Sequence, residues 1–513
     1  MPARKDGAIY HISHHAIITP DRIAATFIPS GRTITFGALE ARTNQSAHAL
    51  RALGLQRGDC VGISITNQPE FLSAMLAAQR IGLYYVLLST KLSLDDLAYV
   101  IADSQMKVLI ISGGCFAAET PEALAGLKVK VCGLDIVNAG LDDWADLVAA
   151  QPASLPADCS KGRDLPYSSG STGRPKGILK TLPDEAFDGH DPVNLGVAAV
   201  YDVGPSSVFL LPCPFYHAAP HRFINAVLHA GAALVVAEHF DAELCLMAIG
   251  DHGCTHSLWV PTMFHRMLQL PDAVRAAANL ATHKHAIHGA APCPVHVKQR
   301  MIDWWGPIID EYYSGSEGIG STSISSAEWM AHPGSVGRPL DCVVHVLDPN
   351  GTELAAGEIG DIYFESDRPF EYLGDARKTL QITSAQGWRT FGDIGHVDAD
   401  GYLYLTDRRH FTIISGGVNL YPQEMESVLL EHEAIKDAAV IGVPDDEFGQ
   451  VAIAIVQLVD ATRATEEMQA TIRAYVRARL GPIKTPKRVA FEVDFPRHAT
   501  GKLYKRDLIA RYS

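Results

Sequence analysis

The chain has 513 residues, of which 47% are apolar, 20% charged and 8% aromatic. This composition can bury a large apolar core, which excludes disordered and fibrous proteins. The 43 basic and 58 acidic residues give a formal charge of -15 at pH 7. Nucleic acid is therefore not expected as a partner, because binding to its backbone depends on clustered Lys and Arg.

The sequence also argues against a membrane span and against export. Apolar runs such as 232–237 are far shorter than the ~20 residues that a spanning helix needs. Residues 1–13 lack the apolar centre of a signal peptide. The nine cysteines form no C-x-x-C pair, and His283, His285 and His288 match no recognised metal-ligand spacing. We therefore expect a cytoplasmic protein without a transmembrane segment.

The first four hundred residues alternate between helical and strand-like patterns. Leu39, Ala47 and Leu50 recur at helical spacing, and the apolar run 60–65 that follows is typical of a strand. The pattern continues with a helix over 69–80, an apolar run over 82–88, a helix over 93–103 and a strand over 108–112. This alternation predicts parallel α/β layers.

The pattern changes beyond about residue 390, where turn residues precede a strand at 402–405 and a charged joint at 407–410. The residues that follow predict a strand over 411–414, a helix from Pro422, a strand over 437–443 and a helix over 465–480. We expect a large N-terminal α/β domain over 1–406 and a small C-terminal α+β domain over 407–513.

A run rich in Ser, Thr and Gly, with the sequence YSSGSTGRPKG, occupies residues 167–177. Glycine lets backbone amides converge on an anion, hydroxyls add donors, and Lys176 adds positive charge. It is not the common nucleotide loop, because Gly177 stands where that motif requires Ser or Thr. The run therefore predicts a phosphate-binding loop, and a flexible surface turn is the structural alternative.

The order of residues in this run resembles the signature of the adenylate-forming superfamily, which includes acyl-CoA synthetases, amino-acid-activating modules and firefly-type luciferases. Four later segments resemble further motifs of that family in the family's order: 313–317 (YSGSE), 387–393 (GWRTFGD), 407–408 with 414–424 (DR and ISGGVNLYPQE), and 496–502 (PRHATGK). Ser314, Ser316 and Phe391 replace the usual Gly, Thr and Thr. The resemblance implies the layered fold of adenylate-forming enzymes with a small mobile C-terminal domain.

The resemblance also implies a reaction, in which a carboxylate attacks the α-phosphate of ATP and a thiol then attacks the acyl-adenylate. It assigns the phosphate contacts to Ser168, Ser169, Gly170, Ser171, Thr172 and Lys176, and the adenine slot to Gly289, Ala290, Ala291 and Tyr313. It assigns Ser316 to the α-phosphate, Glu317 to Mg²⁺, Asp393 and Arg408 to the ribose, and Lys502 to the reacting carboxylate. The structural alternatives are a helix-start acid for Glu317, a turn residue for Asp393 and a solvated charge for Lys502.

For the thiol step, the resemblance implies that the C-terminal domain turns about a hinge at 407–410. Gly416 and Gly417 would flank the channel of the thiol arm, and Asn419 belongs to the same cofactor-binding motif. The sequence departs from the family at His410, where relatives carry Lys or Asp. It departs again at His239, where relatives carry a basic residue that contacts CoA.

The segment PFYH at 214–217 resembles one in acyl-CoA synthetases whose histidine gates the acyl tunnel. His217 favours a plain carboxylic acid, because a buried ammonium group without a carboxylate partner is costly. A packed core histidine is the structural alternative. The candidate acyl pocket comprises His217, Ala218, Ala219, Asn225, Trp259, Val260, Met263, His288 and Ser314. It favours a medium- or long-chain or bulky apolar acid, and fatty, aromatic and steroid-type acids all stay open.

The sequence thus predicts an AMP-forming acyl-CoA ligase of fatty-acid metabolism that uses ATP, Mg²⁺ and coenzyme A, with Lys502, Glu317, Lys176 and His217 as catalytic residues. Because no carrier domain follows Lys502 in the sequence, free CoA is the expected acceptor. The alternatives are an aryl- or amino-acid adenylating enzyme that loads a carrier protein, a luciferase-like oxygenase, and a non-catalytic nucleotide-binding protein. A homodimer is also left open.

Overall fold

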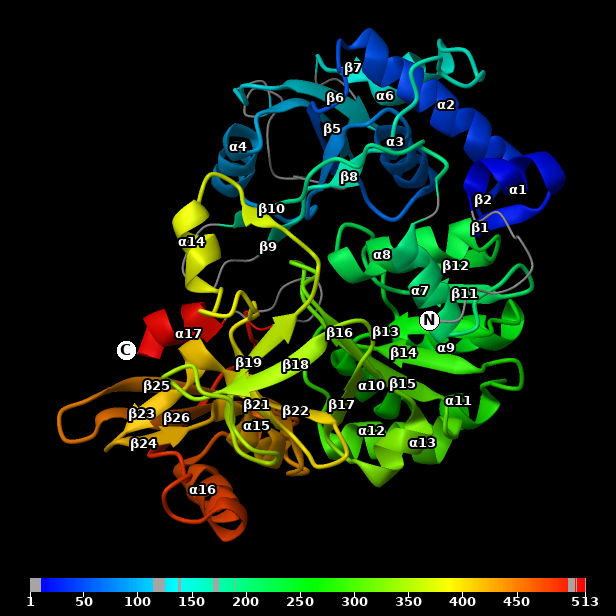
Figure 1. Ribbon diagram of the computed structural model, residues 1–513. Coiled ribbons are helices and arrows are strands. Elements are labelled where there is room, and N and C mark those ends of the chain that lie inside the picture. Colours follow the sequence, from blue (N-terminus) through cyan, green and yellow to red (C-terminus); the bar gives the residue numbers. More distant parts are fainter. Residues whose placement is uncertain are drawn as a thin grey trace. The chain divides into compact units, whose positions relative to one another are not determined.

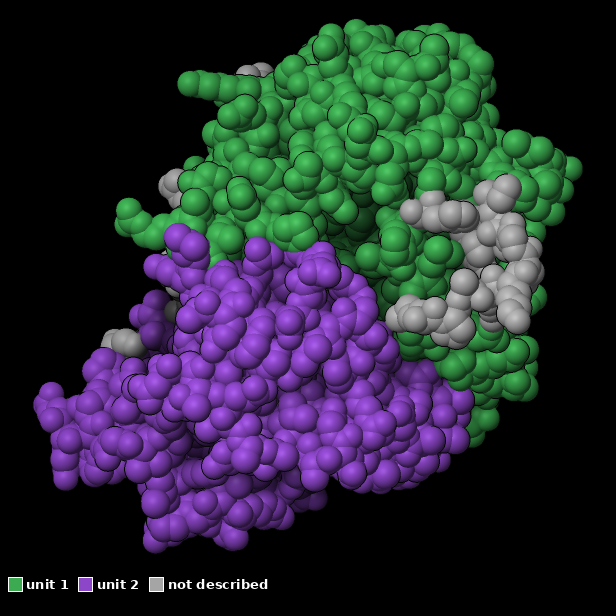
Figure 2. Space-filling view, viewed as in Figure 1, with its two compact units in different colours: residues 1–259, 269–287, 369–379 green, residues 260–268, 288–368, 380–513 purple. Residues whose placement is uncertain are grey.

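The computed structural model describes residues 11–113, 124, 126–136, 140–168, 175–189, 191–496, 503 and 505–512. Two compact units are distinguished in Figure 2. Unit 1 comprises residues 1–259, 269–287 and 369–379, and unit 2 comprises 260–268, 288–368 and 380–513. The predicted division between residues 406 and 407 falls inside unit 2 and stays a prediction. Within the described ranges, no helix combines the length and apolar character needed to cross a membrane.

Unit 1 contains two largely parallel sheets with helices beside them (Figure 1). Its elements are α1 (Ile12–Ile18), β1 (Ile23–Ile28), β2 (Thr33–Thr35), α2 (Phe36–Ala52), β3 (Cys60–Ser64), α3 (Pro69–Arg80), β4 (Tyr84–Leu87), α4 (Leu94–Asp103), β5 (Met106–Ser112), β6 (Lys130–Leu134), β7 (Asp142–Asp143), α6 (Trp144–Ala149), β8 (Arg163–Asp164), β9 (Tyr167–Ser168), β10 (Lys176–Leu179), α7 (Pro192–Val200), β11 (Val208–Leu211), α8 (Ala218–His229), β12 (Ala233–Ala237), α9 (Ala242–Asp251), β13 (His256–Trp259), α11 (Asp272–Ala277), β14 (His285–His288), β20 (Glu371–Tyr372) and α14 (Ala376–Gln381). β14 and α14 each end in unit 2.

The first sheet has the strand order β7-β6-β5-β3-β4-β8, and all of its paired strands are parallel. The second has the order β14-β13-β11-β12-β1-β2, in which β1 and β2 pair antiparallel. A third, small antiparallel sheet has the order β20-β10-β9. In β5, six of the seven residues are buried, as expected for a parallel strand covered on both faces. The helices predicted over 69–80 and 93–103 are confirmed as α3 and α4, and the strands predicted over 60–65 and 108–112 as β3 and β5. The apolar run over 82–88 contains β4.

Unit 2 contains two sheets that are mostly antiparallel. Its elements are α10 (Pro261–Leu268), α12 (Val295–Trp305), β15 (Ile309–Ser314), β16 (Ser321–Ile324), α13 (Ser326–Ala331), β17 (Ser335–Pro339), β18 (Val343–Leu347), β19 (Gly360–Glu365), β21 (Asp393–Val397), β22 (Leu403–Arg408), the 3-10 helix η1 (Arg409–Phe411), β23 (Ile413–Ser415), β24 (Val418–Leu420), α15 (Pro422–Leu430), β25 (Ile435–Asp445), β26 (Gly449–Leu458), η2 (Ala461–Arg463), α16 (Glu466–Leu480), β27 (Arg488–Phe491) and α17 (Lys505–Tyr512). The strand orders are β18-β19-β21-β22-β17-β16-β15 and β24-β23-β26-β25, with β27 paired to β26.

The C-terminal sheet shows why these residues form an α+β layer. Val440 on β25 and Ala454 on β26 belong to the same buried cluster as Ile472 and Val476 of α16. Their neighbours along the strands, such as Ile441, belong to a second cluster with Leu508 of α17. Successive side chains of a strand point to opposite faces, so the apolar strands bury both faces under helices. One prediction was wrong: 411–414 is not all strand, because η1 occupies 409–411 and β23 starts at Ile413.

Candidate active site

The best-defined part of the site is the Asp393 carboxylate in unit 2. Asp393 is 5% exposed and begins β21, where it pairs in register with Arg408 at the end of β22. Tyr313 Oη donates a hydrogen bond to Oδ2 at 2.5 Å, and Arg408 Nε lies 3.1 Å from Oδ1. Burial and the neighbouring carboxylate raise the pKa of Tyr313 well above its usual value, so the phenol keeps its proton. Asp393 is therefore not a solvated turn residue.

The predicted adenine loop follows β14 and exposes its backbone. Gly289 is buried, and a Cβ there would lie 2.6 Å from the ring of Tyr312, so the close approach requires glycine. Ala290 has φ 67°, a left-handed conformation that costs a non-glycine residue about 1–2 kcal/mol. Ala290 and Ala291 are exposed. The loop thus offers peptide groups with little side-chain bulk, which suits contact with a flat base.

Ser316 and Glu317 lie on the turn between β15 and β16, and both are partly exposed. The amide of Gly318 donates to the carbonyl of Gly315 at 3.0 Å and closes this turn. No helix begins here, which excludes the alternative of a helix-start acid for Glu317. Phe391, which replaces the usual Thr of the family motif, packs edge-on against Tyr313 with ring centroids 5.8 Å apart.

The two arms of the predicted phosphate loop lie side by side in unit 1. β9 and β10 pair antiparallel, so that Ser168 faces Lys176 in the register. Lys176 Nζ lies 3.9 Å from Asp375 Oδ2. Tyr167 Oη donates to Asp103 Oδ2 at 2.6 Å, which ties one arm to α4. The strand pair therefore holds both ends of the loop together at its base.

Several predicted residues lie outside the part of the chain that the structure describes. These are Ser169, Gly170, Ser171 and Thr172 of the loop, Lys502, and the side chain of Ser168. Their assignments stay predictions. Of the predicted residues that are described, Lys176 and His217 belong to unit 1, whereas Tyr313, Glu317, Asp393 and Arg408 belong to unit 2.

His217 is the N-cap residue of α8 and is partly exposed, so it is not a packed core histidine. The segment before it is fixed by Asn67, a buried residue that sequence analysis missed. Asn67 Nδ2 donates to the carbonyls of Cys213 at 3.1 Å and Ala237 at 2.9 Å, and its Oδ1 accepts from the amide of Phe215 at 2.9 Å. These bonds join the ends of β11 and β12.

The candidate acyl residues fall into two groups. Ala218 and Ala219 are partly exposed in the first turn of α8, whereas Asn225, Trp259, Val260, Met263 and His288 are buried. Ser314 Oγ donates to the carbonyl of Gly320 at 2.8 Å. Asn225 contacts His221 and Gln79, two polar residues that sequence analysis also missed.

A buried ion pair lies beneath the adenine loop. Lys298 on α12 is 0% exposed, and its Nζ lies 2.7 Å from Glu311 Oε2 on β15. His288, which directly precedes the loop, has its Nε2 3.4 Å from the same oxygen. Burial, with a smaller effect of Lys298, holds the pKa of His288 well below its usual value. Burial also raises the pKa of Glu311, although Lys298 opposes that rise. The imidazole is therefore neutral.

The glycines of the predicted thiol channel form a tight hairpin turn between β23 and β24. Gly416 and Gly417 have φ 56° and 81°, values that permit a two-residue hairpin loop with both residues left-handed. Asn419 is exposed on β24, and His410 is exposed within η1. His239 is exposed after β12. Their roles toward CoA or in a hinge stay predictions.

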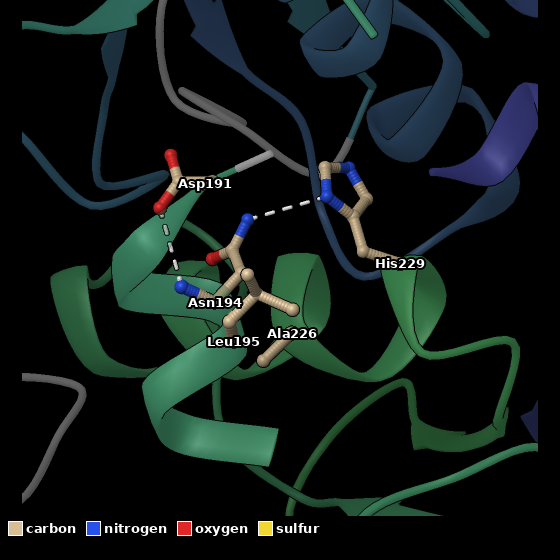
Figure 3. A pocket seen from close by; sticks show the side chains of 5 residues that line it. All are labelled: Asp191, Asn194, Leu195, Ala226 and His229. Atoms are coloured by element: carbon tan, nitrogen blue, oxygen red, sulfur yellow. Dashed lines mark hydrogen bonds between the residues drawn. The ribbon is translucent and has the colours of Figure 1, made fainter. Parts of the chain in front are cut away.

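Figure 3 shows a hollow between α7 and α8, lined by Asp191, Asn194, Leu195, Ala226 and His229. Asp191 Oδ1 caps α7 by accepting from the amide of Asn194 at 3.2 Å, and Asn194 Nδ2 lies 3.3 Å from Nδ1 of His229. Burial lowers the pKa of His229 to about 4. None of the predicted site residues that the structure describes lines this hollow, and its polar groups bond to one another across the two helices.

Comparison with known proteins identifies the family to which this chain belongs. The AMP-binding enzyme family matches residues 12–371, and the AMP-binding enzyme C-terminal domain matches residues 424–502. The chain therefore belongs to the AMP-binding enzymes, which confirms the predicted adenylate-forming superfamily and fold. It is an enzyme of the AMP-forming ligase class, as predicted.

Proteins similar to this chain match nearly its full length. The long-chain-fatty-acid–CoA ligase FadD13 of Mycobacterium tuberculosis is 29% identical over 98% of both chains. A feruloyl-CoA synthase of Amycolatopsis is 30% identical over 94% of both chains. The crystal structure of ATP-bound MatB from Rhodopseudomonas palustris has 27% identity and a TM-score of 0.82 over 98% of both chains.

Proposed function

We propose that the protein is an ATP-dependent ligase that joins a carboxylic acid to coenzyme A through an acyl-adenylate. A carboxylate oxygen attacks the α-phosphorus of ATP and pyrophosphate leaves; the CoA sulfur then attacks the acyl carbon and AMP leaves. The observation that carries the proposal is the buried Asp393 carboxylate, held between Tyr313 and Arg408 on the motifs of an AMP-binding enzyme. The similarity to two CoA ligases supports it.

In this proposal the nucleotide is held chiefly by unit 2. Asp393 binds both ribose hydroxyls, because its two oxygens retain lone pairs after the bonds to Tyr313 and Arg408. Arg408 adds a contact to the same sugar. The adenine lies against Tyr313 and the backbone of 289–291, where side chains are small.

The phosphates meet groups that neutralise charge, which is the main task of a phosphoryl-transfer site. The loop hydroxyls of 168–172 and Lys176 hold the β- and γ-phosphates, and Ser316 contacts the α-phosphate. Glu317 is the residue that would hold Mg²⁺, because hard cations prefer carboxylate oxygens and this side chain lies partly exposed on a turn. Bound there, the ion neutralises phosphate oxygens.

The small domain, over 407–513, acts in both steps by turning about the joint 407–410. Lys502 contacts the reacting carboxylate during adenylation only. Gly416, Gly417 and Asn419 flank the thiol arm during thioester formation. The acid is a medium- or long-chain or bulky apolar one, with His217 at the entrance of its pocket.

The experiment that tests the proposal is pyrophosphate release from ATP and Mg²⁺ over a panel of fatty, aromatic, steroid-type and amino acids, each with and without CoA. We expect turnover with at least one plain carboxylic acid that rises strongly with CoA, with the acyl-CoA detected by mass spectrometry. Pyrophosphate release that CoA leaves unchanged would favour a carrier-protein acceptor. Bound ATP without pyrophosphate release for any acid would contradict a ligase.

A further inference from the structure

A second lysine lies near the lysine of the predicted phosphate loop. Lys378 on α14 has its Nζ 5.7 Å from the centre of the Tyr372 ring, and Lys176 on β10 has its Nζ 6.0 Å from the same point. The two ammonium nitrogens are therefore at most 11.7 Å apart, which is the sum of these two distances. All three residues belong to unit 1.

The strand pairing explains why Tyr372 lies near Lys176. β20 pairs antiparallel with β10, so that Tyr372 lies opposite Ile178, and the amide of Leu373 donates to the carbonyl of Gly177 at 2.8 Å. Directly opposite residues, and residues two apart on one strand, point to the same face of a sheet. Lys176 and Tyr372 therefore share one face of the small sheet that also holds the base of the phosphate loop.

Hydrogen bonds hold the first turn of α14 against β20 and thereby position Lys378. Asp375 Oδ1 accepts from the amide of Lys378 at 3.0 Å, and the amide of Asp375 donates to the carbonyl of Tyr372 at 3.0 Å. Thr379 Oγ1 accepts from the amide of Tyr372 at 3.0 Å. Because these bonds close the turn onto the strand, the backbone of Lys378 is held beside Tyr372 before any ligand binds.

The charges around Tyr372 favour an anion. Asp375 Oδ2 lies 3.9 Å from Lys176 Nζ, at the limit of an ion pair, and the two side chains are 45% and 23% exposed, so water weakens their attraction. Glu371 is exposed and precedes Tyr372 on β20, so its side chain points to the opposite face of the sheet. A phosphate oxygen that contacts an ammonium group directly would therefore compete well with Asp375 for Lys176.

We propose that Lys378 is a second phosphate-binding lysine, which contacts the β- and γ-phosphates of ATP together with Lys176 and keeps this contact with the pyrophosphate that leaves. The inference rests on the proposed ligase function, in which Lys176 meets these phosphates, and it adds a residue from outside the phosphate-loop motif. Phosphoryl-type transfer needs the charge of the leaving group to be neutralised, and the flexible four-carbon stem of a lysine lets its charge follow that group. Packing of Lys378 against Tyr372 alone is the structural alternative.

The test measures the Kd of ATP with Mg²⁺, of pyrophosphate with Mg²⁺ and of AMP by isothermal titration. It compares the unmodified protein with Lys378→Met, which removes the charge and keeps an unbranched side chain. We expect the Kd of ATP and of pyrophosphate to rise by about 10- to 100-fold, because a hydrogen bond to a charged group is lost. The Kd of AMP, which lacks the β- and γ-phosphates, should stay unchanged and so shows that the variant is folded. Lys378→Arg, which keeps the positive charge, should retain most of the affinity.

The matched control is Arg377→Met, which removes one positive charge at the neighbouring exposed position and should change the Kd of ATP by less than about 3-fold. Equal rises in the Kd of ATP and of AMP for Lys378→Met would indicate a structural role and overturn the inference. A change for ATP no larger than that in Arg377→Met would also overturn it. Failure of the proposed ligase function is a separate result, in which ATP and pyrophosphate bind as expected and no acid supports pyrophosphate release.

Discussion

Tyr313 and Asp393 are joined by a hydrogen bond of 2.5 Å between Oη and Oδ2, across 80 residues of sequence. The phenol keeps its proton because its pKa is raised well above the usual value by burial and by the carboxylate itself. Arg408 contacts the other oxygen of Asp393. A charge-assisted bond on each oxygen orients the carboxylate before any nucleotide arrives, and such bonds are stronger than neutral ones.

Two variants distinguish the contribution of the Asp393 carboxylate to ATP binding from that of Tyr313, which orients it. Asp393→Ala should weaken ATP binding by about 1.5–3 kcal/mol, because bonds to a charged group are lost. Tyr313→Phe keeps the ring and removes only the hydroxyl, so the loss should be smaller, about 0.5–1.5 kcal/mol for one hydrogen bond. Isothermal titration with ATP and Mg²⁺ measures both values. Unchanged ATP affinity in Asp393→Ala would remove this residue from the site.

Lys502 is expected to act in one half-reaction only. Lys502→Ala should reduce pyrophosphate release by at least about 100-fold, because a charge that stabilises the transition state is lost. Thioester formation from a supplied acyl-adenylate should be largely unaffected. The comparison needs rapid mixing of the variant with acyl-adenylate and CoA, followed by product analysis. Equal losses in the two half-reactions would refute the division of roles.

The contrast between Asp393 and Asn67 shows how far the sequence predicts this site. Asp393 stands in a contiguous motif, so its position and role could be proposed before its partners Tyr313 and Arg408 were seen. Asn67 bonds to the backbone at Cys213, Phe215 and Ala237, and no local pattern in the sequence connects it to these distant segments.

The fold shows the same difference between features that local sequence signals predict and features that they do not. Helices such as α3 were predicted with their bounds because apolar periodicity and the N-terminal Pro69 are local signals. The 3-10 helix at 409–411 was missed because Phe411 and Ile413 together resemble a short strand. The Lys298–Glu311 pair was also missed, since isolated charges in a sequence are usually solvated.

The buried Lys298–Glu311 ion pair gives a third prediction, which concerns stability. Lys298→Met removes the partner of Glu311, which is 5% exposed, and leaves a carboxylate without its charge partner in the core. The free energy of unfolding should fall by about 3–5 kcal/mol, the usual loss when one member of a buried pair is removed. Urea denaturation followed by tryptophan fluorescence measures the change. Lys298 Nζ lies 4.9 Å from the centre of the Trp329 ring, so the fluorescence of Trp329 reports unfolding around the ion pair in unit 2.

The double variant Lys298→Met with Glu311→Leu is the matched control. Replacing a buried pair by apolar residues of similar volume is often neutral for stability. The double variant should therefore recover most of the stability that Lys298→Met loses. If both variants are destabilised equally, the ion pair is not the cause.

Buried histidines predict a loss of stability in mild acid. His256 is 2% exposed, its Nε2 lies 2.7 Å from the carbonyl oxygen of Tyr201, and burial lowers its pKa from 6.5 to about 4. Between these values the unfolded chain takes up a proton that the folded chain does not. The contribution of His256 to stability is therefore complete above pH 6.5 and falls as the pH drops toward 4.

Comparing His256→Gln with the unmodified protein at about pH 7.5 and about pH 5 isolates this effect. The unmodified protein should lose about 2 kcal/mol more of its unfolding free energy over that interval than the variant does. Above about pH 8 the two proteins should show the same pH dependence, because histidine is neutral in both states. Parallel loss of stability in both proteins between pH 7.5 and 5 would show that His256 is not kept neutral by the fold.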